Sequence, residues 1–130
     1  MPRVATYYQL LDNPVDVSAT PLTLNQSVAD TPAGGEGALV TWFAGAAVAG
    51  SGVVTYTVTL NGSPIGSYEV ISTFPTITGA SRIPVQETIA SSVVKHGSGA
   101  AGNNVLVFTK TGGLATLTLS AVMLWHRVNV

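Results

Sequence analysis

The chain has 130 residues, the length of one ordinary domain, and 8% of them are charged, against about 25% in a typical soluble protein. Five basic and six acidic residues leave a net charge of −1, so no basic stripe exists that could neutralise a row of phosphates, and nucleic-acid binding is excluded. The absence of cysteine excludes disulfides and thiolate metal sites, and the longest glycine- and alanine-rich apolar stretch, residues 43–48, is too short to cross a bilayer.

Alternation of apolar and polar residues predicts short strands along the first third of the chain. Residues 6–11 and a proline-interrupted segment at 15–24 indicate edge strands or an N-terminal arm within residues 1–30. A proline- and glycine-rich loop is expected at residues 30–37, followed by a strand at 38–44.

The clearest strand is predicted at residues 53–60. Apolar side chains share one of its faces and threonines the other, and the strand runs into Asn61-Gly62. Because both residues tolerate positive φ, this dipeptide is a strong hairpin signal, and residues 65–71 are expected to form the return strand.

Residues 85–94 fit both a helical stripe and a strand. We expect a strand that ends near Ile89 and then one short helical turn within residues 90–95. Two further strands are expected at 105–110 and 116–126.

The spacing of these elements predicts one all-β domain over residues 1–130. It has about eight strands in an antiparallel, jelly-roll-like β-sandwich.

No set of catalytic or metal-ligating residues is recognisable. The glycine-rich segment at 97–102 matches G-x-G-x-x-G, but a β-branched strand follows it where a dinucleotide site needs a helix, so a loop is expected. His96 and His126 have no acidic neighbour at ligand spacing, and the six carboxylates are scattered singly. We therefore expect no enzyme activity, no metal and no cofactor.

Two of the expected strands carry apolar residues on both faces. In 38–44, Val40 and Trp42 oppose other apolar residues, and in 117–125 the odd positions are apolar while Val122 and Leu124 lie on the opposite face. One face of each strand in a two-sheet sandwich should meet water, so a second cover is needed, either another chain or the 30–37 loop. The interpretation that follows is an oligomer or docking interface formed by Val40, Trp42, Val122 and Leu124.

Residues 58–66, VTLNGSPIG, resemble the V-x-L-N-G-x-x-I-G hairpin of galactose-binding-like jelly rolls. Residues 87–94 with 102–108 resemble the f-x-I-P-x-s-l-l and G-x-N-x-l-x-f segments of the same sandwiches, and 117–124 is similar to their closing strand. The resemblance departs at Ala90, where those proteins have proline, and at the glycine-rich insertion before Asn103. It implies the fold over roughly residues 52–125 and assigns no sugar-binding residue.

Sandwiches of this kind serve as sugar-binding modules, accessory domains and virion proteins. The small size, low charge and absence of a secretory signal are also similar to the capsid-decoration and tail-associated proteins of tailed bacteriophages. The main functional hypothesis is a non-enzymatic virion protein, made in the host cytoplasm, that forms a homo-oligomer, with a trimer favoured, or docks on a capsid or tail, without binding a membrane.

The alternative is a secreted carbohydrate-binding module of jelly-roll type that stacks a glycan on Trp42 and Tyr68. Trp125 is expected to be buried, because the residues around it are apolar on both faces of the strand.

Overall fold

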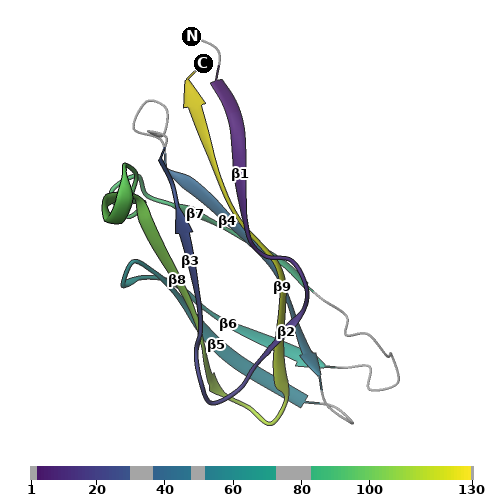
Figure 1. Cartoon of the computed structure of the whole chain (residues 1–130). Helices are drawn as coiled ribbons and strands as arrows, with labels where there is room; N and C mark the ends of the chain where they lie inside the picture. Colours follow the sequence, from purple (N-terminus) through teal and green to yellow (C-terminus); the bar gives the residue numbers. More distant parts are fainter. Residues whose placement is uncertain (1–2, 30–36, 48–51, 73–82, 130) are drawn as a thin grey trace.

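Two antiparallel sheets packed face to face make up the computed structural model, which describes residues 3–29, 37–47, 52–72 and 83–129 (Figure 1). The first sheet has the order β1-β9-β4-β7, with the short β2 also paired to β9, and the second has the order β3-β8-β5-β6. The strands are β1 (Arg3–Leu11), β2 (Val15–Val17), β3 (Leu22–Ser27), β4 (Ala38–Ala47), β5 (Gly52–Leu60), β6 (Ser63–Ser72), β7 (Ile83–Ile89), β8 (Asn103–Gly112) and β9 (Thr116–Asn129). The expected all-β jelly-roll sandwich is confirmed, with nine strands in the described residues.

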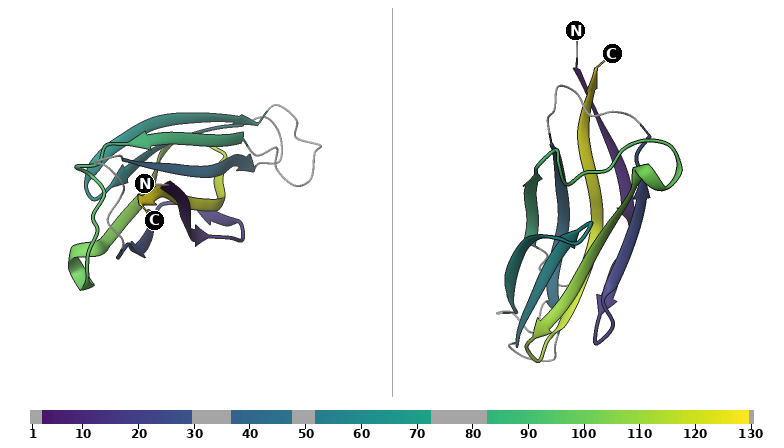
Figure 2. Two further views of the ribbon diagram at one scale, coloured as in Figure 1. Left: turned by 90° about the horizontal axis from the view of Figure 1, so that it is seen from above. Right: turned by 90° about the vertical axis from the view of Figure 1, so that its left-hand side faces the viewer.

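The N-terminal residues supply edge strands to both sheets. β1 lies at the edge of the first sheet and pairs with β9 from Arg3↔Asn129 onward, so β1 starts beside the end of β9 in every view (Figures 1 and 2). β3 forms an edge of the second sheet through its pairing with β8.

The hairpin between β5 and β6 is confirmed. Asn61 and Gly62 have φ angles of 52° and 81°, the left-handed conformation that a two-residue hairpin turn requires. β5 and β6 pair in the expected antiparallel manner, and the apolar face of β5 is buried in the core.

The segment after β7 makes one turn within residues 90–95, as expected, and the 3₁₀ helix lies further along the chain. β7 ends at Ile89 as predicted, and a hydrogen-bonded turn follows in which Val93 N donates to Ala90 O at 3.0 Å. The helical element of the described chain is the 3₁₀ helix η2 (Gly99–Gly102), which leads directly into β8. Gly97 and Gly99 both have positive φ, so the glycine-rich segment supplies the backbone freedom for this turn and is not a dinucleotide site.

The four residues predicted to form a docking interface lie in the core. Val40, Trp42, Val122 and Leu124 are 0–2% exposed and pack between the two sheets. Trp42 Nε1 donates a hydrogen bond to the Tyr56 hydroxyl of the opposite sheet at 2.9 Å. A surface made of these four side chains is therefore not available on the folded chain, and that prediction is wrong.

A β-bulge in β9 explains why this strand appeared apolar on both faces. Thr41 pairs with Met123 and Phe43 with Ser120, so the two residues Ala121 and Val122 stand opposite Trp42 alone. Ala121 has a φ of 48°, and the bulge reverses the alternation of the strand at this point. The leucines before the bulge therefore face the same core as Val122 and Leu124, which follow it. Met123 and Trp125 are turned to the outer surface.

Candidate functional site

The outer face of the first sheet brings together side chains from four strands. Cross-strand pairing aligns Tyr7 of β1 with Trp125 of β9, Trp125 with Leu39 of β4, and Leu39 with Thr88 of β7. The adjacent row, built in the same way, consists of Gln9, Met123, Thr41 and Gln86. An aromatic and apolar row thus lies next to a mainly polar one.

Tyr7 and Trp125 form an aromatic platform on this face. Their ring centroids lie 5.1 Å apart with an angle of 39° between the planes. Tyr7 is 56% exposed and Trp125 is half-buried, with Nε1 donating a hydrogen bond to Thr41 Oγ1 at 2.9 Å. This bond fixes the orientation of the indole, so the platform is held in place before any ligand arrives.

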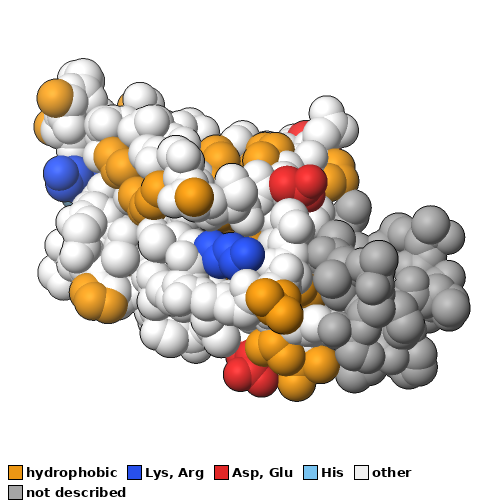
Figure 3. Space-filling model, turned by 90° about the horizontal axis from the view of Figure 1, so that it is seen from below, with side chains coloured by type: hydrophobic (Ala, Val, Ile, Leu, Met, Phe, Trp, Pro, Cys, Tyr) orange, Lys and Arg blue, Asp and Glu red, His pale blue; other side chains and the backbone are white. Residues whose placement is uncertain are grey.

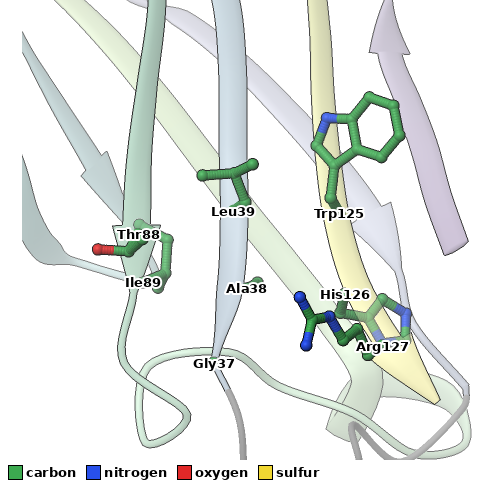
Figure 4. A pocket seen from close by; sticks show the side chains of 8 residues that line it. All are labelled: Gly37, Ala38, Leu39, Thr88, Ile89, Trp125, His126 and Arg127. Atoms are coloured by element: carbon green, nitrogen blue, oxygen red, sulfur yellow. The ribbon is translucent and has the colours of Figure 1, made fainter. Parts of the chain in front are cut away.

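A pocket of about 460 Å³ lies beside the platform, where β4 begins and β7 ends. Its lining consists of Gly37, Ala38, Leu39, Thr88, Ile89, Trp125, His126 and Arg127. Figure 4 shows Leu39 between Thr88 and Trp125, and the Arg127 side chain reaching from β9 toward the start of β4. The lining is mostly apolar and carries a few hydrogen-bonding groups, as is typical of small-molecule sites.

Gly37 is required at the edge of this pocket. A Cβ atom at residue 37 would collide with the carbonyl oxygen of Ile89 and approach Ser91 N to 3.2 Å. Gly37 therefore contributes no side chain to the lining of the pocket.

The two predicted sugar-stacking residues lie outside the pocket. Trp42 is 1% exposed, so its ring cannot contact a sugar, and that part of the prediction is wrong. Tyr68 is partly exposed on β6 of the second sheet, where its hydroxyl donates to Glu87 Oε1 at 2.8 Å and its ring stacks on Tyr56 at 5.2 Å. The structure holds Tyr68 in an aromatic layer between the sheets and does not bring it to the platform.

The residues that line the pocket were missed because Trp125 is turned outward only by the bulge at Ala121. The alternation within β1, with Tyr7 exposed and Tyr8 partly buried, is the sequence signal that could have identified one half of the platform. His126 is 4% exposed, and its ring stacks on Tyr8 at 5.6 Å.

Burial raises the pKa of the Tyr56 hydroxyl and, together with the hydrogen bond to the Glu87 carboxylate, raises the pKa of Tyr68 well above its usual range. Because the folded state holds these protons more tightly than the unfolded state, this stabilisation is complete below the ordinary tyrosine pKa of about 10 and is lost as the pH rises above it. We expect the free energy of unfolding to fall as the pH rises from about 10 toward the raised pKa of Tyr68, and to fall less steeply in Tyr68→Phe.

Urea titrations at several pH values measure this slope. The matched control is Tyr7→Phe, which removes the same hydroxyl group from a side chain that is 56% exposed. A Tyr68→Phe variant whose stability falls as steeply as that of the wild type would contradict the assignment.

Apolar side chains are also exposed elsewhere on the molecule. The turn between β8 and β9 carries Leu114, which is 95% exposed, and Val53 and Ile71 are 37% and 52% exposed on β5 and β6. On the face seen in Figure 3, the hydrophobic side chains of the described residues lie in several groups with polar side chains between them. Scattered apolar residues are normal on protein surfaces, so we place the candidate site on the outer face of the first sheet.

Within residues 3–29, 37–47, 52–72 and 83–129, no group of three or more His, Asp or Glu side chains could hold a metal ion. The same part of the chain contains no helix long and apolar enough to cross a membrane.

No protein-family model and no curated protein matches the chain. Solved structures resemble it at low identity. A family 35 carbohydrate-binding module from Clostridium thermocellum is 15% identical, with a TM-score of 0.51 over 93% of this chain and 97% of that one. Dimeric latent PorU from Porphyromonas gingivalis is 14% identical (TM-score 0.58), and BuGH86wt in complex with neoagarooctaose is 17% identical (TM-score 0.53).

These likenesses show the fold. They confirm the jelly-roll sandwich that the sequence motifs implied, of the kind found in carbohydrate-binding modules. In the other two comparisons the match includes 98% of this chain. It spans only 13% of PorU and 19% of BuGH86wt.

Proposed function

We propose that this domain is a non-catalytic carbohydrate-binding module that holds a glycan against the outer face of the first sheet. The observation that carries the proposal is the aromatic platform of Tyr7 and Trp125 beside an open pocket. A pyranose ring has an apolar face of C–H groups and a polar rim, so it combines stacking on an aromatic ring with hydrogen bonds at its edge. The pocket offers both kinds of contact.

The polar partners lie where the rim of a stacked sugar would reach. Thr88 lines the pocket across from Trp125, and the row with Gln9 and Gln86 lies next to the platform. The amide and hydroxyl groups of these residues can both donate and accept hydrogen bonds, as sugar hydroxyls do. The described lining contains no carboxylate, and glycoside hydrolysis uses a pair of them.

The comparisons support this proposal through the fold. The family 35 carbohydrate-binding module matches this chain over 97% of its own length, so it is a whole domain of the same size and architecture. Domains of one fold bind many different ligands, so the residues of the site carry the proposal. The virion hypothesis rested on the low charge, the small size and an interface of four residues; those four are buried in the core, and no comparison supports the hypothesis.

The test is binding of the wild type and of Trp125→Ala to a panel of soluble plant, algal and bacterial polysaccharides. Affinity electrophoresis identifies the ligand, and titration calorimetry with its oligosaccharides measures the affinity. We expect Trp125→Ala to weaken binding by about 30-fold, the loss of about 2 kcal/mol that follows truncation of a central aromatic contact.

Trp125→Ala also removes the hydrogen bond to Thr41, so its fold is checked by circular dichroism. Tyr7→Ala removes the exposed half of the platform with less risk to folding and should also weaken binding. Ile71→Ala is the control, because Ile71 is 52% exposed on the second sheet. A wild type that binds no polysaccharide, or platform variants that bind as tightly as Ile71→Ala, would refute the proposal.

A further inference from the structure

We infer that the pocket beside the platform selects a sugar that carries an anionic group, a carboxylate or a sulfate, and that Arg127 determines this specificity. The inference rests on the proposed function and names the ligand class of the same site. Three observations carry it: the position of Arg127 relative to Trp125, the missing side chain at Gly37, and the charge of the residues that line the pocket.

Arg127 and Trp125 are two residues apart on β9, after the bulge, and both line the pocket. A strand rises by about 3.3 Å per residue, so their Cα atoms lie roughly 7 Å apart along the strand. This separation is comparable to the width of one pyranose ring with its exocyclic group. A sugar stacked on the indole can therefore place a substituent at the guanidinium group.

Gly37 adds no side chain to the pocket, because a Cβ atom at residue 37 would collide with the Ile89 carbonyl oxygen. Figure 4 shows the Arg127 side chain extending toward this part of β4, below Leu39. The guanidinium group is thus part of the pocket lining near a position without a side chain.

Arg127 is the one charged residue in the described lining, so the charge that these lining residues carry is positive. Glu87 precedes the pocket residue Thr88 on β7, but it faces the opposite side of the sheet, where its carboxylate accepts the hydrogen bond of Tyr68. Neutral sugars gain little from such a field, whereas a carboxylate or sulfate forms charge-assisted and often bidentate hydrogen bonds with arginine.

A guanidinium group carries five N–H donors. Arg127 can therefore receive an anionic substituent while it keeps a contact within the chain.

The experiment compares glycans that differ only in charge. Oligogalacturonate and its methyl-esterified form make one pair, and sulfated and desulfated galactan oligosaccharides make the other, so the two pairs separate a carboxylate ligand from a sulfate ligand. For at least one pair we expect the wild type to bind the charged member about ten-fold more tightly, which corresponds to one charge-assisted hydrogen-bonded pair. Added salt should reduce this ratio.

Arg127→Gln should bring the affinity ratio of the charged and neutral members close to one, and Arg127→Lys should restore part of it. Lys110→Gln removes the same charge from β8 on the second sheet and should keep the wild-type ratio. The inference is overturned if the wild type binds both members of each pair equally well, or if Arg127→Gln keeps the preference. In either case the proposed function survives, whereas failure to bind any glycan would refute both.

Discussion

Replacing Asn104 with alanine is expected to lower the free energy of unfolding by about 3 kcal/mol. Asn104 is 1% exposed, and its carboxamide joins segments that are far apart in the chain. Its Oδ1 accepts hydrogen bonds from Lys95 N at 2.8 Å and from Asn61 Nδ2 at 3.0 Å. Its Nδ2 donates to Lys95 O at 2.8 Å and to Gly102 O at 3.2 Å. Alanine would leave these buried or half-buried groups without partners, and each orphaned group costs about 1–3 kcal/mol.

Urea denaturation measures this loss, and Asn103→Ala is the matched control at the adjacent position. Asn103 is half-exposed, so its replacement should change the stability by less than about 0.5 kcal/mol. If Asn104→Ala is as stable as Asn103→Ala, the carboxamide does not hold the segment between β7 and β8 in place. That segment follows Ile89, the last residue of β7, which lines the pocket. If Asn104→Ala disorders the segment, glycan binding should weaken as well.

The sequence features that predicted the fold are local ones. The alternation in β5 and the positive φ of Asn61 and Gly62 depend on neighbouring residues, and the structure confirms both. The motif resemblance extends this to the segment that leads into β8, where Asn104 occupies the asparagine position of the G-x-N pattern. The hydrogen bonds of Asn104 explain why an amide side chain serves at that position.

The assignment of strand faces could not be made from local patterns. β4 has apolar residues at both parities, so the alternation alone does not decide whether Leu39 or Val40 faces the core, and a shift by one residue exchanges the two faces. In β9 the bulge occurs at Ala121, which has a left-handed φ of 48° although alanine rarely adopts this conformation. No residue type in the sequence predicts this bulge, and the outward position of Trp125 depends on the bulge.

The candidate site also could not be predicted from the sequence, because its row of side chains crosses four strands. Tyr7, Trp125, Leu39 and Thr88 become neighbours only through the sheet order β1-β9-β4-β7, in which no two adjacent strands follow each other in the chain. Periodicity shows which residues share a face of one strand, but it does not give the order of the strands in a sheet. Local patterns therefore predicted the class of fold but did not locate the candidate site.

The second large effect is expected for Trp42→Ala, which should lower the free energy of unfolding by about 4 kcal/mol, as large aromatic truncations in a core do. Trp42 is 1% exposed and packs edge-on against Phe108 and Tyr68, each with ring centroids 5.3 Å away. Its Nε1 donates to the Tyr56 hydroxyl, so the indole joins the two sheets by packing and by a hydrogen bond. Thermal and urea unfolding measure the loss, and Tyr56→Phe, which removes only the acceptor, should cost about 1–2 kcal/mol.

Trp42→Phe separates this core role from sugar stacking, because the smaller ring leaves the variant stable enough for binding measurements. A core residue predicts a loss of stability with the glycan affinity of the folded protein unchanged. For Trp125→Ala we expect the reverse, a weaker glycan affinity with a smaller loss of stability. The Trp125 ring is half-buried at the outer surface and contributes less to the core. The two variants together test whether the glycan binds at Trp125 and not at Trp42. If folded Trp42→Phe binds glycan ten-fold more weakly while Trp125→Ala binds normally, the ligand does not lie on the outer face of the first sheet.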